Sequence, residues 1–239
     1  MEVQNKKQVF KLTNLPVSEA GWLIISFLFS SCAQIVVPAG GAKDIQPPKA
    51  EKYIPDSAAT NFNAKTITIT FDEYIQLTDL QKELTISPPI RIQPEVEAKG
   101  RMLQIELKDT LKKNTTYVLN FGNSIRDFTE SNAKTDFLYI FSTGSIIDTL
   151  KMAGTVKNAY DQKTDKGILV MLYEVFEDYI PYKTGPSYFA KTNADGTYKI
   201  NNIRPGKYKA FALKDANGNY RYDVPTESIG FSDTLIKIF

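Results

Sequence analysis

In the stretch KTITITF, residues 65–71, polar and apolar side chains alternate from Thr66 onward. Successive side chains of a β-strand point to opposite faces, so this pattern predicts a strand that buries one face and exposes the other. RMLQIELK at 101–108 and TTYVLNF at 115–121 alternate in the same way, and DFLYIFSTG at 136–144 ends in a Thr-Gly turn. Together these stretches predict a set of half-buried strands.

Turn signals separate the predicted strands at the spacing of a β-sandwich. They are Pro88-Pro89, Lys99-Gly100 and Lys113-Asn114. No long helical period follows residue 50, so the pattern does not favour βαβ units. The predicted fold class is therefore all-β.

The order of motifs across residues 47–144 resembles a known domain family. The stretches that carry the resemblance are PPKAEKYIPDSAATNFNAKTITITFDEYI, LTISPPI, LKDTLKKNTTYVLNFGNSIRDFTESN and YIFSTG. In this order they look like the bacterial Ig-like domain of surface-layer-type proteins and many exported lipoproteins. The resemblance implies a β-sandwich over residues 47–144.

A second block of strands follows, with a seam near SIIDTLKM at 145–152. AGTVKNAYDQKTDKGILVMLYE and SYFAKTNADGTYKINNIRPGKYKAFALKDANGN supply strands with turns at Asp195-Gly196 and Pro205-Gly206. The T-x-x-D-G-x-Y and G-x-Y elements resemble the transthyretin-like fold of carboxypeptidase regulatory-like domains. The resemblance implies a second β-sandwich over residues 151–239, and we expect it to be truncated at its C-terminal end.

The single cysteine, Cys32, directly follows the apolar run 22–29 and Ser30-Ser31. Lysines precede the run, and this order is typical of a secretory signal. The run is shorter than the ~20 residues that span a bilayer. FSSCA resembles a bacterial lipoprotein box, which implies a signal peptide at 1–31 and a lipid on Cys32. The alternative is a buried N-terminal helix that carries the cysteine by chance.

Residues 32–46 are predicted to be a tether, because Pro38, Gly40 and Gly41 disfavour a helix or a central strand. The chain has 29 Lys and Arg against 27 Asp and Glu, a net charge of +2, and the two signs alternate along it. No basic patch results, so nucleic acid is not an expected partner.

Catalytic arrangements find little support in the sequence. There is no histidine, which excludes a Ser-His-Asp relay and Cys–His chemistry. Asp72 and Glu73 are neighbours, and neighbours on a strand point to opposite faces, so they cannot flank one bond. A Ser-Lys pair stays open. We expect no enzyme.

Two groups of residues are candidate binding sites. Tyr179 and Tyr182 lie in YEVFEDYIPYKTGPSYF, residues 173–189, where exposed rings would suit a glycan and buried rings would be core. Oxygen-bearing residues alternate in KDANGNYRYDVPTE, residues 214–227, at Asp215, Asn217, Asn219 and Asp223. This resembles a calcium loop, although Glu227 is one residue beyond the bidentate position. The alternative is a hairpin whose side chains cap its own backbone.

The combined interpretation is a non-catalytic envelope lipoprotein, anchored in the outer membrane through Cys32 and facing the periplasm or the surface. Its role is predicted to be that of a spacer or of an adhesion and interaction module. Two alternatives remain: a glycan-binding accessory lipoprotein for polysaccharide capture, and the N-terminal part of a longer envelope enzyme. Calcium is the one cofactor for which the sequence offers a site, and the partner is expected to be an envelope protein or a glycan.

Overall fold

The structure is a computed structural model, and it describes residues 41–239. The predicted signal peptide, Cys32 and most of the predicted tether lie outside the described residues. Within residues 41–239 no helix is both long and apolar enough to cross a membrane. Residues 44–239 form one compact unit of β-strands with two helices of four residues each.

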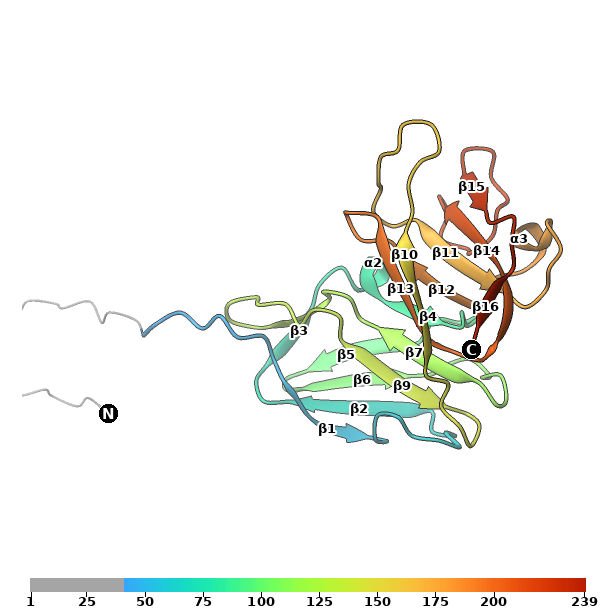
Figure 1. The fold of residues 1–239 in the computed structure, drawn as a ribbon. Coiled ribbons are helices and arrows are strands. Elements are labelled where there is room, and N and C mark those ends of the chain that lie inside the picture. The colour runs from blue at the N-terminus through green and yellow to red at the C-terminus, as the bar shows by residue number, and fades with distance from the viewer. Residues whose placement is uncertain (1–40) are drawn as a thin grey trace, which may run out of the picture. The chain divides into compact units, whose positions relative to one another are not determined.

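Strands between residues 50 and 142 form the first sandwich (Figure 1). Its largest sheet has four strands in the order β1-β2-β6-β5. Two smaller sheets have the orders β4-β7-β9 and β3-β8. All of these neighbouring strands pair antiparallel. The elements are β1 Ala50–Ile54, β2 Thr66–Phe71, β3 Ile75–Leu77, α2 Leu80–Glu83, β4 Thr85–Ser87, β5 Glu95–Lys99, β6 Met102–Glu106, β7 Thr116–Asn120, β8 Ile125–Asp127 and β9 Leu138–Ser142.

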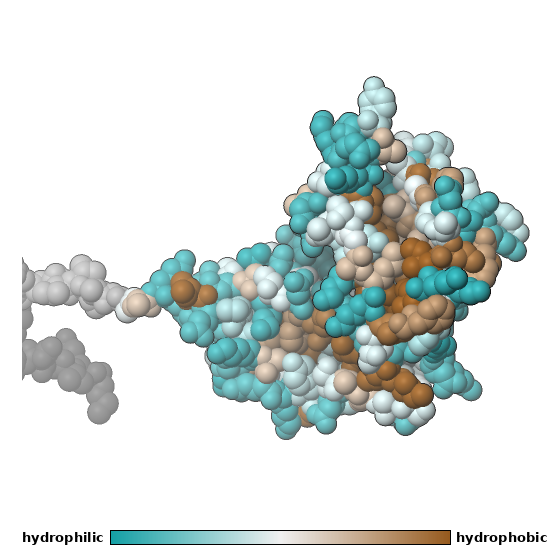
Figure 2. Space-filling view, viewed as in Figure 1, coloured by the Kyte–Doolittle hydropathy of each residue, from teal (hydrophilic) through white to brown (hydrophobic). Residues whose placement is uncertain are grey.

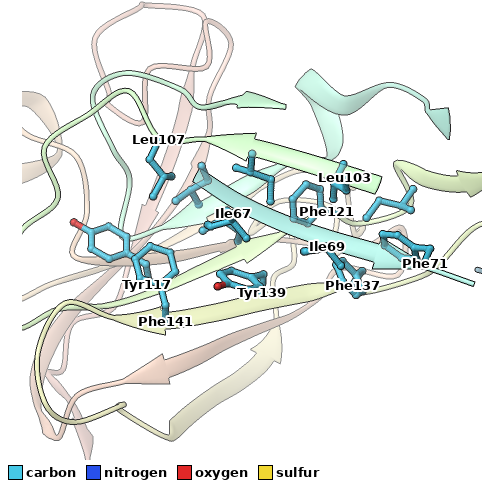
Figure 3. Packing of buried hydrophobic residues seen from close by; sticks show 14 of the residues in the cluster. Ile67, Ile69, Phe71, Leu103, Leu107, Tyr117, Phe121, Phe137, Tyr139 and Phe141 are labelled. Atoms are coloured by element: carbon cyan, nitrogen blue, oxygen red, sulfur yellow. The ribbon is translucent and has the colours of Figure 1, made fainter. Parts of the chain in front are cut away.

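The alternation in β2 builds the core of the first sandwich. Ile67, Ile69 and Phe71 are fully buried, whereas the threonines between them are half-buried. Figure 3 shows these three side chains pointing toward an aromatic layer that includes Tyr117 and Phe141. Each side chain of this kind contributes about 1.5–3 kcal/mol relative to an exposed one. Burial of one face of β2 therefore fixes its register.

Strands between residues 150 and 238 form the second sandwich. Its large sheet has the order β12-β11-β14-β15, β16 also pairs with β14, and β10 pairs with β13. The elements are β10 Leu150–Thr155, β11 Leu169–Tyr173, α3 Ile180–Lys183, β12 Tyr188–Lys191, β13 Thr197–Ile203, β14 Gly206–Lys214, β15 Ser228–Phe231 and β16 Ile236–Ile238. The prediction of an all-β chain with two β-sandwich regions is confirmed.

Strand β11 is buried on both faces, which explains why its sequence, LVMLY, does not alternate. Val170 and Leu172 belong to the core shared with β10 and β13. Leu169, Met171 and Tyr173 face the other way, into a second cluster closed by Ile180 of α3 and by tyrosines of residues 215–227. The outer face of the large sheet is therefore covered in part by α3 and by this loop, called the 215–227 loop below.

Candidate functional sites

The two predicted ligand-binding tyrosines lie at α3, between β11 and β12. Tyr179 directly precedes the helix and is 47% exposed, and Tyr182 within it is 56% exposed. The ammonium of Lys183 lies 4.1 Å from the ring centroid of Tyr179. The rings of Tyr182 and Tyr222 are in an edge-to-face arrangement at a centroid distance of 4.9 Å. Both rings are therefore accessible.

The other aromatics of the same stretch divide between surface and core. Phe176 is also exposed. Tyr173, Tyr188 and Phe189 are buried, and they contribute to the two cores of the second sandwich. The core alternative is thus correct for the flanking strands, whereas Tyr179 and Tyr182 stay on the surface.

The carboxylate of Asp215 organises the start of the 215–227 loop. Its Oδ1 accepts hydrogen bonds from the backbone N–H of Asn217 at 3.2 Å and of Gly218 at 2.8 Å, and its Oδ2 accepts one from Tyr220 at 2.9 Å. Gly218 has φ of 76° and no atom within 4 Å of an added Cβ. The first candidate calcium ligand therefore caps the backbone of the loop.

The other three candidate calcium ligands lie together. The carboxylate of Asp223 accepts hydrogen bonds from the side-chain amides of Asn217 at 3.0 Å and Asn219 at 2.7 Å. The amide oxygens of both asparagines accept backbone N–H groups, from Asn219 and Arg221. This is the arrangement that the hairpin alternative describes. Within residues 41–239, no group of three or more acidic side chains is placed to hold a metal ion, and calcium binding stays a prediction.

Glu227 closes the loop, a role that sequence reasoning missed. It is buried, and it accepts backbone hydrogen bonds from Ala216 at 3.0 Å, Asp223 at 3.1 Å and Val224 at 3.3 Å. Burial alone would raise the pKa of Glu227, but these N–H groups outweigh it and hold the pKa below its usual range. Glu227 lies outside the alternating positions in the sequence, so the sequence pattern did not indicate this role.

The 215–227 loop and the exposed tyrosines adjoin. The backbone N–H of Tyr222 donates to the carbonyl of Pro181 in α3 at 3.0 Å. Tyr220 packs on Phe189 of β12 at a centroid distance of 4.7 Å. The loop thus packs against α3, and a change in the loop conformation would alter the position of Tyr182.

A group of polar contacts joins the two sandwiches at Asp148. The Oδ2 of Asp148 accepts a hydrogen bond from Thr116 Oγ1 of β7 at 3.0 Å, and the backbone N–H of Asp148 donates to the same hydroxyl at 3.0 Å. The carbonyl of Asp148 accepts from Asn202 Nδ2 of β13 at 2.7 Å, and the guanidinium of Arg204 lies 3.7 Å from Oδ1. The predicted seam is therefore bonded to a strand on each side.

A second contact between the sandwiches involves β4 and β12. The backbone N–H of Phe189 donates to Ser87 Oγ at 3.2 Å in a buried position. The ammonium of Lys191 donates to the carbonyl of Lys82 at 3.0 Å. One edge of the large sheet of the second sandwich thus lies against the first sandwich.

The fold defines a class of protein: antiparallel β-sandwich modules arranged in tandem along the chain. Residues 44–143 match the family model described as bacterial Ig-like domain. The chain therefore contains a bacterial Ig-like domain, which occupies the first sandwich. The transthyretin-like type of the second sandwich stays a prediction.

Two similar solved structures cover much of the described chain. The S-layer protein rSbsC is 15% identical, with a TM-score of 0.29 over 81% of this chain and 25% of that protein. BcpA, the major pilin subunit of Bacillus cereus, is 14% identical, with a TM-score of 0.23 over 80% of this chain and 65% of the pilin. The chain thus spans a quarter of the S-layer protein. No curated protein matches the sequence.

Proposed function

We propose that the protein is a non-catalytic, lipid-anchored protein of the bacterial envelope that acts as a spacer or as an adhesion and interaction module. The observation that carries the proposal is the bacterial Ig-like domain bonded through Asp148 to a second sandwich. A spacer must keep its outer end at a set distance from its anchor. Bonds on both sides of the seam serve this purpose, because they restrict hinge motion between the sandwiches.

In this proposal the lipid on Cys32 attaches the two sandwiches to the outer membrane, and the sandwiches face the periplasm or the surface. The order of lysines, apolar run, small residues and Cys32 supports a lipid on the cysteine. One acyl chain binds a membrane only marginally, and stable anchoring takes more than one membrane-binding signal. The proposal therefore requires that Cys32 carry more than one acyl chain.

Metabolic labelling tests the anchor. Bacterial cells that express the full chain are grown with a labelled fatty acid, and label and membrane retention are compared with those of Cys32→Ala. We expect both to be lost in this variant and retained in Ser31→Ala, which keeps a small residue before the cysteine. Equal labelling of Cys32→Ala and the unmutated chain would overturn the lipid anchor.

A glycan-binding role is the second candidate, and the exposure of both Tyr179 and Tyr182 favours it. Tyrosine rings offer a flat apolar face together with a hydroxyl, which suits a sugar ring with an apolar side and polar edges. The ammonium of Lys183 and the carboxylate of Glu177 add polar groups beside Tyr179. Together these groups provide both stacking and hydrogen bonding.

Pulldown on cell-wall and plant polysaccharides tests this candidate. We expect Tyr182→Ala to weaken binding about tenfold or more, corresponding to ~1.4 kcal/mol. Tyr160→Ala is the matched control, because Tyr160 is 98% exposed in a different loop. Retention of the unmutated chain by no polysaccharide, or equal losses in the two variants, would exclude a glycan site at α3.

A further inference from the structure

Two aromatic side chains face solvent at one end of the first sandwich. Tyr74 directly precedes β3 and is 65% exposed, and Phe128 directly follows β8 and is 68% exposed. The backbone N–H of Phe128 donates to the carbonyl of Tyr74 at 2.9 Å, which continues the β3–β8 pairing one position beyond Ile75 and Asp127. Residues directly opposite each other in an antiparallel pair lie on one face. Both aromatic side chains therefore leave the β3–β8 pair on the same face.

A third apolar side chain is held at the same end. Ile45 is 80% exposed. The side-chain amide of Asn132, in the turn after β8, donates to the carbonyls of the residues before and after Ile45, at 3.1 and 3.3 Å. Figure 2 shows apolar surface on the segment before β1, surrounded by hydrophilic surface. The three side chains Ile45, Tyr74 and Phe128 are called the apolar tip below.

The apolar tip and the seam lie at opposite ends of the first sandwich. The pairing of β7 with β9 starts at Thr116, which is bonded to Asp148 of the seam. At the other end of this pair, the ring of Phe137 packs against Phe71 at a centroid distance of 5.6 Å. Phe71 is three residues before Tyr74. Figure 1 shows β3 at the end of the first sandwich where the segment before β1 enters.

The tether limits how far the apolar tip can be from the anchor. Ile45 is 13 residues after Cys32, and 13 residues span at most about 45 Å when fully extended. A lipid on Cys32 therefore keeps the apolar tip near the bilayer. Linking of this kind makes the contact intramolecular, at an effective concentration in the millimolar range, so even a weak affinity for lipid is sufficient.

The charges around the apolar tip are balanced. The turn between β5 and β6 belongs to this end of the sandwich, because the carbonyl of Gly100 accepts the backbone N–H of Ile75 at 3.0 Å. Five Lys or Arg and five Asp or Glu are present in the segments that form this end, residues 44–49, 72–74, 99–101 and 126–134. Their summed charge neither attracts nor repels an anionic lipid surface. Affinity for lipid thus depends on the apolar side chains.

From this arrangement we propose that the apolar tip contacts the lipid surface to which Cys32 anchors the chain. Ile45 and Phe128 enter the boundary between headgroups and acyl chains, and the ring of Tyr74 lies at the level of the headgroups, where amphipathic rings are enriched. This contact rests on the proposed lipid anchor. It directs the second sandwich away from the membrane, because the seam is at the other end of the first sandwich.

Fluorescence quenching by lipid tests the contact. Residues 32–239 include the whole compact unit of residues 44–239, and they contain no tryptophan, since the only one is Trp22. This chain is coupled through the thiol of Cys32 to a maleimide phospholipid in vesicles of phosphatidylethanolamine and phosphatidylglycerol with brominated acyl chains. We expect the emission of Phe128→Trp to shift to the blue and to be quenched. Tyr160→Trp, in a loop of the second sandwich, should show neither change.

Two matched pairs of substitutions test the role of the apolar side chains. In the Phe128→Trp chain, Ile45→Asp with Tyr74→Asp should abolish the quenching and leave the melting temperature unchanged, because both positions are exposed. Ile146→Asp with Tyr160→Asp changes the same residue types at exposed positions elsewhere and should leave the quenching intact. Because the charges at the tip are balanced, high salt should leave it intact as well.

The coupling supplies the lipid chemically, so this test and that of the anchor can fail separately. Labelling of Cys32 in cells tests whether the chain is lipidated, and quenching tests whether the apolar tip meets the bilayer. Equal quenching of Phe128→Trp and Tyr160→Trp, or quenching that persists in Ile45→Asp with Tyr74→Asp, would overturn the contact. A blue shift without quenching that grows with the density of chains on the vesicle would assign the apolar tip to a second copy of the chain instead.

Discussion

The carboxylate of Asp127 accepts three backbone hydrogen bonds from the turn that follows β8. Its Oδ1 accepts from Glu130 at 2.6 Å and Ser131 at 2.9 Å, and its Oδ2 accepts from Asn132 at 2.8 Å. Burial alone would raise the pKa of Asp127, but the three N–H groups outweigh it and lower the pKa below its usual value. The aspartate of the I-R-D motif is therefore a structural residue of the Ig-like domain.

Replacement of Asp127 by alanine should lower the free energy of unfolding by about 2–4 kcal/mol, because it leaves several backbone donors without an acceptor. Because the folded-state pKa is lowered, the stabilisation is fully present above the usual pKa near 4 and is lost as the pH falls through the folded value. Urea unfolding between pH 2 and 7 measures both effects. Thr129→Ala, at an exposed position in the same turn, is the control, and a loss equal to that of the control would contradict the structural role.

Asp215 plays the same part in the 215–227 loop. Asp215→Ala should lower the free energy of unfolding by about 1–3 kcal/mol in calcium-free buffer, because the N–H groups of residues 217, 218 and 220 lose their acceptor. Thermal unfolding with calcium and with chelator distinguishes the two predicted roles. A melting temperature that calcium raises in the unmutated chain but not in Asp215→Ala with Asp223→Ala would establish a metal site. If the melting temperature of the unmutated chain is the same with calcium and with chelator, backbone capping is the role of these side chains.

Strands with one buried face could be predicted from the sequence, and short or doubly buried strands could not. The alternating stretches at 65–71 and 101–108 became β2 and β6. β3 and β8 have three residues each, too few for a period of two to be recognised. β11 lacks the alternation because α3 and the 215–227 loop cover its second face, and this covering depends on contacts between distant segments.

Candidate site residues were predicted to different degrees for a similar reason. Composition and alternation pointed to Tyr182 and to Asp215, which are both in surface elements. The cap by Glu227 requires the chain to fold back between residues 216 and 224, and its spacing carries no period. Sequence patterns report local geometry, whereas this contact depends on the closed loop.

The turn between β12 and β13 requires a glycine at position 196 for two reasons. Gly196 has φ of 77°, and an added Cβ would lie 2.7 Å from the carbonyl oxygen of Val156. Gly218 has nearly the same φ, 76°, but open space around it. The left-handed conformation costs a non-glycine residue about 1–2 kcal/mol at either position, and only Gly196 adds a backbone clash.

Gly196→Ala should therefore destabilise the second sandwich more than Gly218→Ala does. We expect the two variants to differ by about 1–3 kcal/mol in the free energy of unfolding, the range typical of overpacking. Chemical denaturation of both full-length variants measures this difference. Equal decreases in the free energy of unfolding would mean that the segment carrying Val156 moves away from the added Cβ without a cost in stability.

At the scale of the whole chain, the least predictable feature is the bonding across the seam. The sequence SIIDTLKM marks the end of one strand pattern and the start of another, which favours a simple linker. The structure instead bonds Asp148 to Thr116 of β7 and to Asn202 of β13. Thr116 and Asn202 lie 32 and 54 residues from Asp148, so no local pattern indicates that they meet.

This bonding predicts how the two sandwiches unfold. Thr116 is buried and the side chain of Asp148 is largely buried, so removal of the carboxylate leaves the Thr116 hydroxyl without its acceptor, although this hydroxyl still accepts from the backbone N–H of residue 148. It also releases the guanidinium of Arg204. In the unmutated chain we expect a single calorimetric transition, because neither sandwich loses these contacts without destabilising the other. In Asp148→Ala we expect two resolved transitions, with the lower one moved down by about 4–8 °C for each kcal/mol lost in a domain of this size.

The control for this experiment is Asp161→Ala, which removes an exposed carboxylate from the loop between β10 and β11. It should keep a single transition. An isolated fragment of residues 45–146 adds an independent measurement, because it retains Thr116 but has lost Asn202 and Arg204. We expect this fragment to unfold cooperatively at the temperature of the corresponding transition in Asp148→Ala. Two transitions in the unmutated chain would instead show that the sandwiches fold independently and that the bonds at Asp148 only orient them.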